Sequence, residues 1–289
     1  MKYAVLGSTG QLGHDLCPRL HGEVISLPQE QADLTQPEVV RSILTKVRPD
    51  LVVNCGAYNL VDQAEREPEA AFAVNAWGVR NVALICRDLG CVLVHFSTDY
   101  VFGLDETRHA PYAEHDPPGP VSIYGLSKLV GEYLARSLCP RHFVIRTCGL
   151  YGRWGSGGKG TNFVETMLRL AGSGKPLRVV ADQRCTPSYT VDVACATAAL
   201  VQTSRYGLYH VVNDGSCSWY EFACAIFELA GVSADLTPIM SSDYGAPARR
   251  PSYSVLSRTA YEALGLPAPQ HWREALAAYL AQRNSKVAL

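Results

Sequence analysis

Residues 2–13, read as KYAVLGSTGQLG, decide the fold of this chain of 289 residues. The apolar run that ends at Leu6 has the composition of a buried β-strand. Three glycines follow, Gly7, Gly10 and Gly13, directly before residues that can form a helix. Such glycines let the backbone turn sharply and approach a pyrophosphate, while the helix N-terminus attracts negative charge. The stretch therefore predicts a dinucleotide-binding turn, with a purely structural turn as the alternative.

Strand and helix patterns alternate through the first half of the sequence. Apolar strand candidates cover residues 2–7, 23–27, 50–57, 91–98 and 142–147. Helix candidates lie between them, over residues 11–20, 37–47, 68–90 and 123–138. Buried strands separated by helices are typical of a parallel sheet with helices on both faces. We therefore predict an α/β fold, a Rossmann-type doubly wound parallel sheet with a smaller C-terminal α/β substrate lobe.

The pattern changes after residue 150, where a glycine-rich segment precedes further helix candidates. We expect residues 1–150 to form a dinucleotide-binding Rossmann domain, with a returning segment around 176–205. Residues 151–175 and 206–289 are then expected to form the substrate-binding lobe. This lobe should pack at the carboxyl edge of the sheet, where open α/β sheets bind ligands. We expect the glycine-rich segment to be a mobile loop.

Composition narrows the class of protein. Hydrophobic residues make up 47% and charged residues 18%, with a net charge of −1, which indicates a globular chain. The near-neutral charge argues against nucleic-acid binding and against a basic membrane anchor, and no apolar run is long enough to span a bilayer. The first residues resemble a strand and not a signal peptide. The ten cysteines show no CxxC spacing, so we expect reduced thiols and a cytoplasmic location. A homodimer is a separate expectation, which does not rest on the cysteines.

A second motif, SIYGLSK at residues 122–128, places Tyr124 four positions before Lys128. Residues four apart share one helix face, so both side chains can reach the same ligand. A nearby ammonium lowers the pKa of a tyrosine toward the range that suits proton transfer. Thr98, at the end of the fourth strand, can offer its hydroxyl to a carbonyl oxygen. We predict that Thr98, Tyr124 and Lys128 catalyse carbonyl reduction by a nicotinamide; the alternative is an ordinary amphipathic helix.

Further stretches make the sequence similar to a known family. They are GSTGQLG (7–13), VDQAE (61–65), STDYVF (97–102), YGLSK (124–128), GKGTNF (158–163), DQRCTP (182–187) and RRPSYSVL (249–256). Together they resemble the dTDP-4-dehydrorhamnose reductase family, within the extended short-chain dehydrogenase/reductase superfamily. The resemblance implies reduction of the 4-keto group of a nucleotide-diphosphate 4-keto-6-deoxy sugar, foremost dTDP-4-dehydro-L-rhamnose. No carboxylate ends the second strand to repel a 2′-phosphate, which favours NADPH over NADH.

The resemblance also implies binding residues. The cofactor set is Gly7, Thr9, Gly10, Gln11, Leu12, Gly13, Asp33, Leu34, Gly56, Ala57, Tyr58, Tyr124 and Lys128. The substrate set is Thr98, Asp99, Asn162 and Arg250. Arg250 is expected to meet the diphosphate through two hydrogen bonds. Asp33 is expected to contact the adenine, a role compatible with capping the helix that follows. No metal is expected, because the tail AQRNSKVAL (281–289) contains no acidic residue.

The sequence departs from the family pattern at two positions. Tyr100 stands where related dehydratases have a glutamate base, which favours reduction over dehydration. Gly149 stands where the family usually has a tryptophan that packs against the sugar; Trp154 either fills this space or anchors its own loop. Two alternatives stay open: a reductase of a different nucleotide sugar, and a non-catalytic regulatory subunit resembling that of methionine adenosyltransferase.

Overall fold

A parallel sheet of six strands forms the centre of the computed structural model, which describes residues 1–155 and 160–284. The strand order is β10-β5-β4-β3-β1-β2. The strands are β1 (Lys2–Leu6), β2 (Glu23–Leu27), β3 (Leu51–Asn54), β4 (Val92–Thr98), β5 (His142–Thr147) and β10 (Gly207–His210). The order reverses direction at β1, so the switch point lies between β1 and β3, where doubly wound sheets bind ligands. The predicted α/β fold is confirmed.

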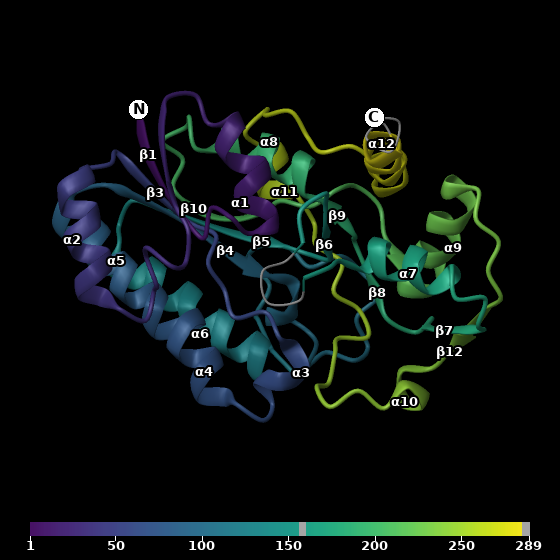
Figure 1. The fold of residues 1–289 in the computed structure, drawn as a ribbon. Helices are drawn as coiled ribbons and strands as arrows, with labels where there is room; N and C mark the ends of the chain where they lie inside the picture. Colours follow the sequence, from purple (N-terminus) through teal and green to yellow (C-terminus); the bar gives the residue numbers. More distant parts are fainter. Residues whose placement is uncertain (156–159, 285–289) are drawn as a thin grey trace.

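Helices cover both faces of the sheet (Figure 1). One face carries α1 (Gln11–Leu16), α8 (Thr190–Leu200) and α11 (Thr259–Glu262). The other face carries α2 (Pro37–Val47), α5 (Val79–Leu89) and α6 (Ile123–Leu138). Each face buries its own apolar cluster between sheet and helices, as the alternation of buried strands and helices predicts.

The helix expected over residues 68–90 forms as one run with a wider turn in its middle. It consists of α4 (Pro68–Phe72), the π-helical segment η2 (Ala73–Gly78) and α5. Pro68 occupies the first turn, where its missing N–H leaves no bond unmade, and Gly90 closes the run in the left-handed conformation. The shorter elements of this half are η1 (Cys17–Arg19), α3 (Val61–Ala64) and η3 (Asp99–Val101).

A smaller lobe packs beside the carboxyl edge of the sheet (Figure 1). Its helices are α7 (Phe163–Ala171), α9 (Trp219–Ala230), α10 (Ser241–Tyr244) and α12 (Trp272–Asn284). Its paired strands are β6 (Leu150–Tyr151) with β9 (Ser188–Tyr189), β7 (Leu177–Val180) with β12 (Leu236–Ile239), and β8 (Arg184–Cys185) with β11 (Cys217–Ser218). An aromatic cluster that includes Tyr151, Phe222 and Trp272 forms the core of this lobe.

Two strands lie elsewhere than the sequence interpretation placed them. Strand β10, expected in the substrate lobe, pairs in parallel with β5 and completes the central sheet. Strand β7, within the expected returning segment 176–205, pairs instead with β12 in the smaller lobe. The part of that segment that returns is α8, whose apolar residues pack on the sheet. This crossover brings the chain back beside the open edge of β5, which β10 then covers.

All ten cysteines lie in the described part of the chain and have free thiols. Within residues 1–155 and 160–284, no helix combines the length and apolar character needed to cross a membrane. The loop expected to be mobile includes residues 156–159, and the acid-free tail includes 285–289; both stretches lie outside the described residues.

Candidate active site

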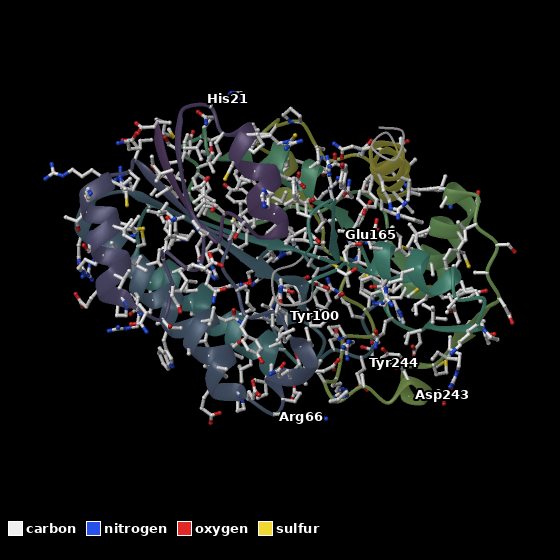
Figure 2. The ribbon with its side chains drawn as sticks, viewed as in Figure 1. His21, Arg66, Tyr100, Glu165, Asp243 and Tyr244 are labelled. Carbon is white, nitrogen blue, oxygen red and sulfur yellow. The ribbon has the colours of Figure 1, made fainter. Side chains whose placement is uncertain are left out.

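A cleft of about 1420 Å³ runs along the carboxyl edge of the sheet into the smaller lobe. Tyr100 lies between the sheet and the smaller lobe and Tyr244 lies on α10 (Figure 2), and both line the cleft. The sequence-predicted residues that line it are Gly7, Thr9, Gly10, Gln11, Leu12, Gly13, Gly56, Ala57, Thr98, Asp99, Tyr124, Lys128, Asn162 and Arg250. All the predicted catalytic and substrate residues and most of the predicted cofactor residues therefore meet in one cleft.

The glycine turn after β1 forms one end of the cleft. Gly7 has a φ of 69°, and a Cβ there would lie 2.8 Å from the backbone nitrogen of Gly56. A Cβ at Gly13 would lie 2.7 Å from the carbonyl oxygen of Gly7. No side chain caps the first turn of α1, whose N-cap is Gly10. The turn is thus too tight for larger residues, and no side chain covers the N–H groups of the helix.

Two buried polar atoms at this turn have no hydrogen-bond partner among the described residues. They are Ser8 Oγ and Gln11 Oε1. Leaving such a group unpaired costs about 1–3 kcal/mol. A dinucleotide in the cradle would bring its own donors and acceptors to this end of the cleft. The tight glycine turn and the unpaired atoms together fit a dinucleotide cofactor.

Helix α6 places Tyr124 and Lys128 in the middle of the cleft. Ser122 caps the helix by accepting a hydrogen bond from Gly125 N at 3.2 Å. Lys128 is 2% exposed, and its Nζ donates to the carbonyl oxygen of Phe96 at 2.6 Å. Burial lowers the pKa of Lys128 to about 8, and the charge of Glu132 opposes this change. The lysine is therefore a buried group that is still mostly charged at neutral pH.

The pKa of Tyr124 differs from the sequence expectation. Burial raises it to about 12, and a hydrogen bond with Thr98 opposes the rise. The expected lowering by Lys128 is wrong in this structure, because desolvation outweighs every opposing interaction and the ammonium bonds the Phe96 carbonyl. The phenol of Tyr124 consequently keeps its proton at neutral pH.

Asp99 holds the hydroxyl of Thr98 in place. Its carboxylate accepts from Thr98 Oγ1 at 3.1 Å, from Cys148 Sγ at 3.1 Å and from Ser254 Oγ at 2.6 Å. Asp99 is 2% exposed, and burial raises its pKa while these three hydrogen bonds lower it. With its oxygens bonded by three protein donors, the carboxylate is placed to orient Thr98. The direct substrate contact expected from the sequence stays a prediction: Asp99 lines the cleft, and its carboxylate already accepts from three protein side chains.

Arg250 and Asn162 line the cleft but are engaged within the protein. Arg250 forms two parallel hydrogen bonds with Asp62, at 3.0 and 2.9 Å. Asn162 caps α7, accepting from Glu165 N at 3.0 Å and donating to the carbonyl oxygen of Gly152 at 2.7 Å. The predicted contact of Arg250 with a diphosphate would therefore use its remaining N–H groups, on Nε and Nη2, or displace the Asp62 carboxylate.

Three predicted cofactor residues, Asp33, Leu34 and Tyr58, do not line the cleft. The Asp33 carboxylate closes a turn, accepting from both the N–H and the hydroxyl of Thr35 at 2.8 Å. It caps no helix, because the N-cap of α2 is Gln36. Leu34 is buried, and the backbone of Tyr58 is bonded on both sides to the side chain of Asn75.

The sequence interpretation missed several residues of the cleft. They are Gln29, Glu30, Phe163, Met167, Arg178, Gln183, Trp219 and Tyr244. Among the described residues, Arg178 is a cleft cation without an ion-pair partner, whereas Arg249 pairs with Glu106 and Arg250 with Asp62. Phe163 and Gln183 stood in quoted motifs, GKGTNF and DQRCTP; the others are brought in by tertiary packing alone.

Trp154 does not reach the space beside Gly149. Its ring stacks on His14 of α1 at 4.1 Å, with an angle of 16° between the ring planes. It is absent from the lining of the cleft. Of the two readings left open by the sequence, the structure supports the anchor of the loop on α1.

Comparison with known proteins gives consistent matches along the chain. Residues 1–285 match the family model described as the RmlD substrate binding domain. The chain is 44% identical to the spore coat polysaccharide biosynthesis protein SpsK of Bacillus subtilis (strain 168), over 98% of both chains. It is 39% identical to dTDP-4-dehydrorhamnose reductase of Streptomyces griseus, covering 95% of this chain and 91% of the relative. The crystal structure of dTDP-4-dehydrorhamnose reductase from Bacillus anthracis in complex with NADP has a TM-score of 0.92 and 37% identity, covering 97% of this chain and 99% of that one.

Proposed function

Because the chain belongs to the family of the RmlD substrate binding domain, we propose that it reduces a nucleotide-diphosphate 4-keto-6-deoxy sugar at the 4-keto group. The cofactor is NADPH, with NADH as the alternative, and the substrate is dTDP-4-dehydro-L-rhamnose, giving dTDP-L-rhamnose. The names of the Streptomyces griseus and Bacillus anthracis relatives support this reaction and cofactor. The observation that carries the proposal is that Thr98, Tyr124 and Lys128 line the cleft that begins at the glycine turn.

Each catalytic group has a role that its environment supports. When bound, NADPH supplies the hydride. Tyr124, whose pKa is raised to about 12 by burial, holds the proton that is delivered to the carbonyl oxygen. Lys128, which lines the same cleft and is mostly charged at neutral pH, is assigned to cofactor binding beside Tyr124. The Thr98 hydroxyl, which donates its one proton to Asp99 in the structure, would turn this proton to the substrate oxygen beside Tyr124.

The substitution Tyr124→Phe tests this mechanism, because it removes only the proton donor. We expect kcat with dTDP-4-dehydro-L-rhamnose and NADPH to fall by about a hundredfold or more, with little change in NADPH affinity. NADPH oxidation and calorimetric titration measure the two quantities. Tyr133→Phe, at an exposed position of the same helix, is the matched control and should behave as wild type. Equal rates for wild type and Tyr124→Phe would remove Tyr124 from the mechanism.

Two alternatives make different predictions. A reductase of another nucleotide sugar, suggested by Gly149, would turn over a UDP-, GDP- or CDP-linked keto sugar faster than any dTDP-linked one. A regulatory subunit would turn over none of them and would co-purify with a stoichiometric protein partner. The retention of Thr98, Tyr124 and Lys128 in one cleft supports the enzyme over the regulatory subunit.

We also propose the division of labour between the two parts of the chain. Residues 1–150, completed by α8 and β10, bind the dinucleotide, and the remaining segments bind the nucleotide sugar. The free thiols support a reducing compartment, so we infer a cytoplasmic enzyme, which binds neither nucleic acid nor membrane. Light scattering in solution would test the expected homodimer.

A further inference from the structure

An aromatic side chain occupies the space beside Gly149. The φ of Gly149 is 52°, a conformation that favours glycine. A Cβ at this position would lie 3.3 Å from Cη2 of Trp219 and 3.3 Å from Cα of Pro187. Gly149 and Trp219 both line the cleft. The tip of the indole therefore lies in close contact with the position at which a side chain of residue 149 would begin.

The indole of Trp219 is held in a fixed position. Trp219 is the first residue of α9, and the preceding Ser218 forms a capping box with Glu221. Its ring packs against Phe163 at 4.8 Å between centroids. Trp219 also packs against both the aromatic cluster of the smaller lobe and a second apolar cluster beneath the cleft that includes Phe102 and Cys148. Such a side chain presents a rigid surface to a ligand and loses little entropy on binding.

Trp219 lies beside the groups assigned to carbonyl reduction. Cys148, the neighbour of Gly149, donates to Asp99, which in turn accepts from Thr98. The side chain is only partly buried, and its Nε1 donates to no atom of the residues that the structure describes. The six-membered ring of the indole, whose Cη2 lies beside Gly149, thus borders the part of the cleft where the reacting carbonyl must lie.

We propose that Trp219 is a specificity-determining residue that packs against the hexose ring of the nucleotide-sugar substrate. This inference rests on the proposed function. A 6-deoxy hexose presents C–H groups and a methyl group that pack well on an aromatic face, and its hydroxyls can accept from the indole N–H. The nucleotide part lies farther from the reacting carbonyl, so Trp219 should discriminate the sugar and not the base.

Substitution at Trp219 separates sugar recognition from nucleotide recognition. We expect Trp219→Ala to lower kcat/KM for dTDP-4-dehydro-L-rhamnose by about tenfold or more. Its affinities for dTDP and for NADPH should stay within about twofold of wild type, and Trp219→Phe should recover most of the loss. Trp77→Ala, at an exposed tryptophan outside the cleft, is the control and should match wild type.

Three results would overturn the proposal. They are an unchanged kcat/KM in Trp219→Ala, an equal loss of affinity for dTDP alone, and a loss in Trp154→Ala in place of Trp219→Ala. If wild type reduces no dTDP-linked keto sugar, the proposed function fails while the inference can still be tested. Calorimetry with dTDP-L-rhamnose then decides, because equal affinity of wild type and Trp219→Ala for this sugar nucleotide would also overturn the role of Trp219.

Discussion

Lys128 places an ammonium group where water hardly reaches it, with 2% of its surface exposed. Burial lowers its pKa from 10.5 to about 8. Below pH 8 the lysine is charged in both folded and unfolded protein, and the folded state bears the full cost of burying the charge. As pH rises from 8 toward 10.5, the folded state loses its proton first and this cost disappears. Lys128 thus lowers the stability of the folded protein at neutral pH, which is consistent with a role in function and not in stability.

The substitution Lys128→Met should therefore stabilise the protein while abolishing reduction. At neutral pH we expect the free energy of unfolding to rise by about 2 kcal/mol, since removing a burial cost of about 3 kcal/mol outweighs the lost hydrogen bond to Phe96. The gap between variant and wild type should close between pH 8 and 10.5. Urea titrations at both ends of this range measure it. Lys175→Met, at an exposed position, should leave the free energy of unfolding equal to that of wild type. A difference between Lys128→Met and wild type that did not change with pH would contradict the assigned cost of burying the charge.

At the scale of elements, a buried ion pair joins α6 to the sheet. Glu132 is 0% exposed and accepts from Arg146 of β5 through both carboxylate oxygens, each at 2.8 Å. Ser97 of β4 donates to the same carboxylate at 2.5 Å. Glu132 lies one turn after Lys128 on α6, so the pair also fixes the helix segment that carries Tyr124 and Lys128. Such a pair gives little net stability, but breaking it leaves an unpaired buried charge.

Glu132→Gln should lower the free energy of unfolding by about 3–5 kcal/mol, because the Arg146 guanidinium loses its counter-charge. Replacing both residues, as in Glu132→Met with Arg146→Met, should recover most of this loss, since no buried charge then remains. Chemical denaturation of the three variants and wild type measures the effect. Asp88→Asn, which breaks an exposed ion pair with Arg41, should cost about 1 kcal/mol or less. A double variant as unstable as Glu132→Gln would refute this account.

At the scale of the whole molecule, the cleft lies between two hydrophobic cores. The sheet with its helices forms one unit, the aromatic cluster forms the other, and the lining residues come from both. The glycine turn lies at one end of the cleft and α10 at the other. A cofactor and a nucleotide that use the two ends should therefore bind together without competing.

Both ligands should accordingly raise the unfolding temperature, and their effects should at least add. NADPH at about a hundred times its dissociation constant should stabilise the fold by about 2.7 kcal/mol, and dTDP at the same ratio by a similar amount. Differential scanning calorimetry with each ligand and with both tests this arrangement. A combined effect of only about 3.1 kcal/mol, hardly more than that of either ligand alone, would mean that the two compete for one end of the cleft.

Features that depend on neighbouring residues could be predicted from the sequence, whereas contacts between distant segments could not. The glycine turn and the Tyr124–Lys128 face depend on local spacing, and both lie in the cleft as expected. The engagement of Arg250 by Asp62 joins residues 188 positions apart, and no local pattern indicates it. Likewise the contact of Trp219 with Gly149 joins residues 70 positions apart, and no local pattern indicates it. The raised pKa of Tyr124 reflects burial, which spacing alone does not reveal.

Strand β10 comes late in the sequence, and this position affects the chain during its synthesis. Strand β5 is complete at Thr147, yet the strand that covers its edge begins only at Gly207. A ribosome must therefore translate some sixty further codons, at a rate of about 5–20 residues per second, before that edge can close. For several seconds the nascent sheet offers an unpaired, apolar β5 to any other strand nearby. Binding of a chaperone to nascent chains should accordingly peak in this interval and end once residue 210 has left the exit tunnel.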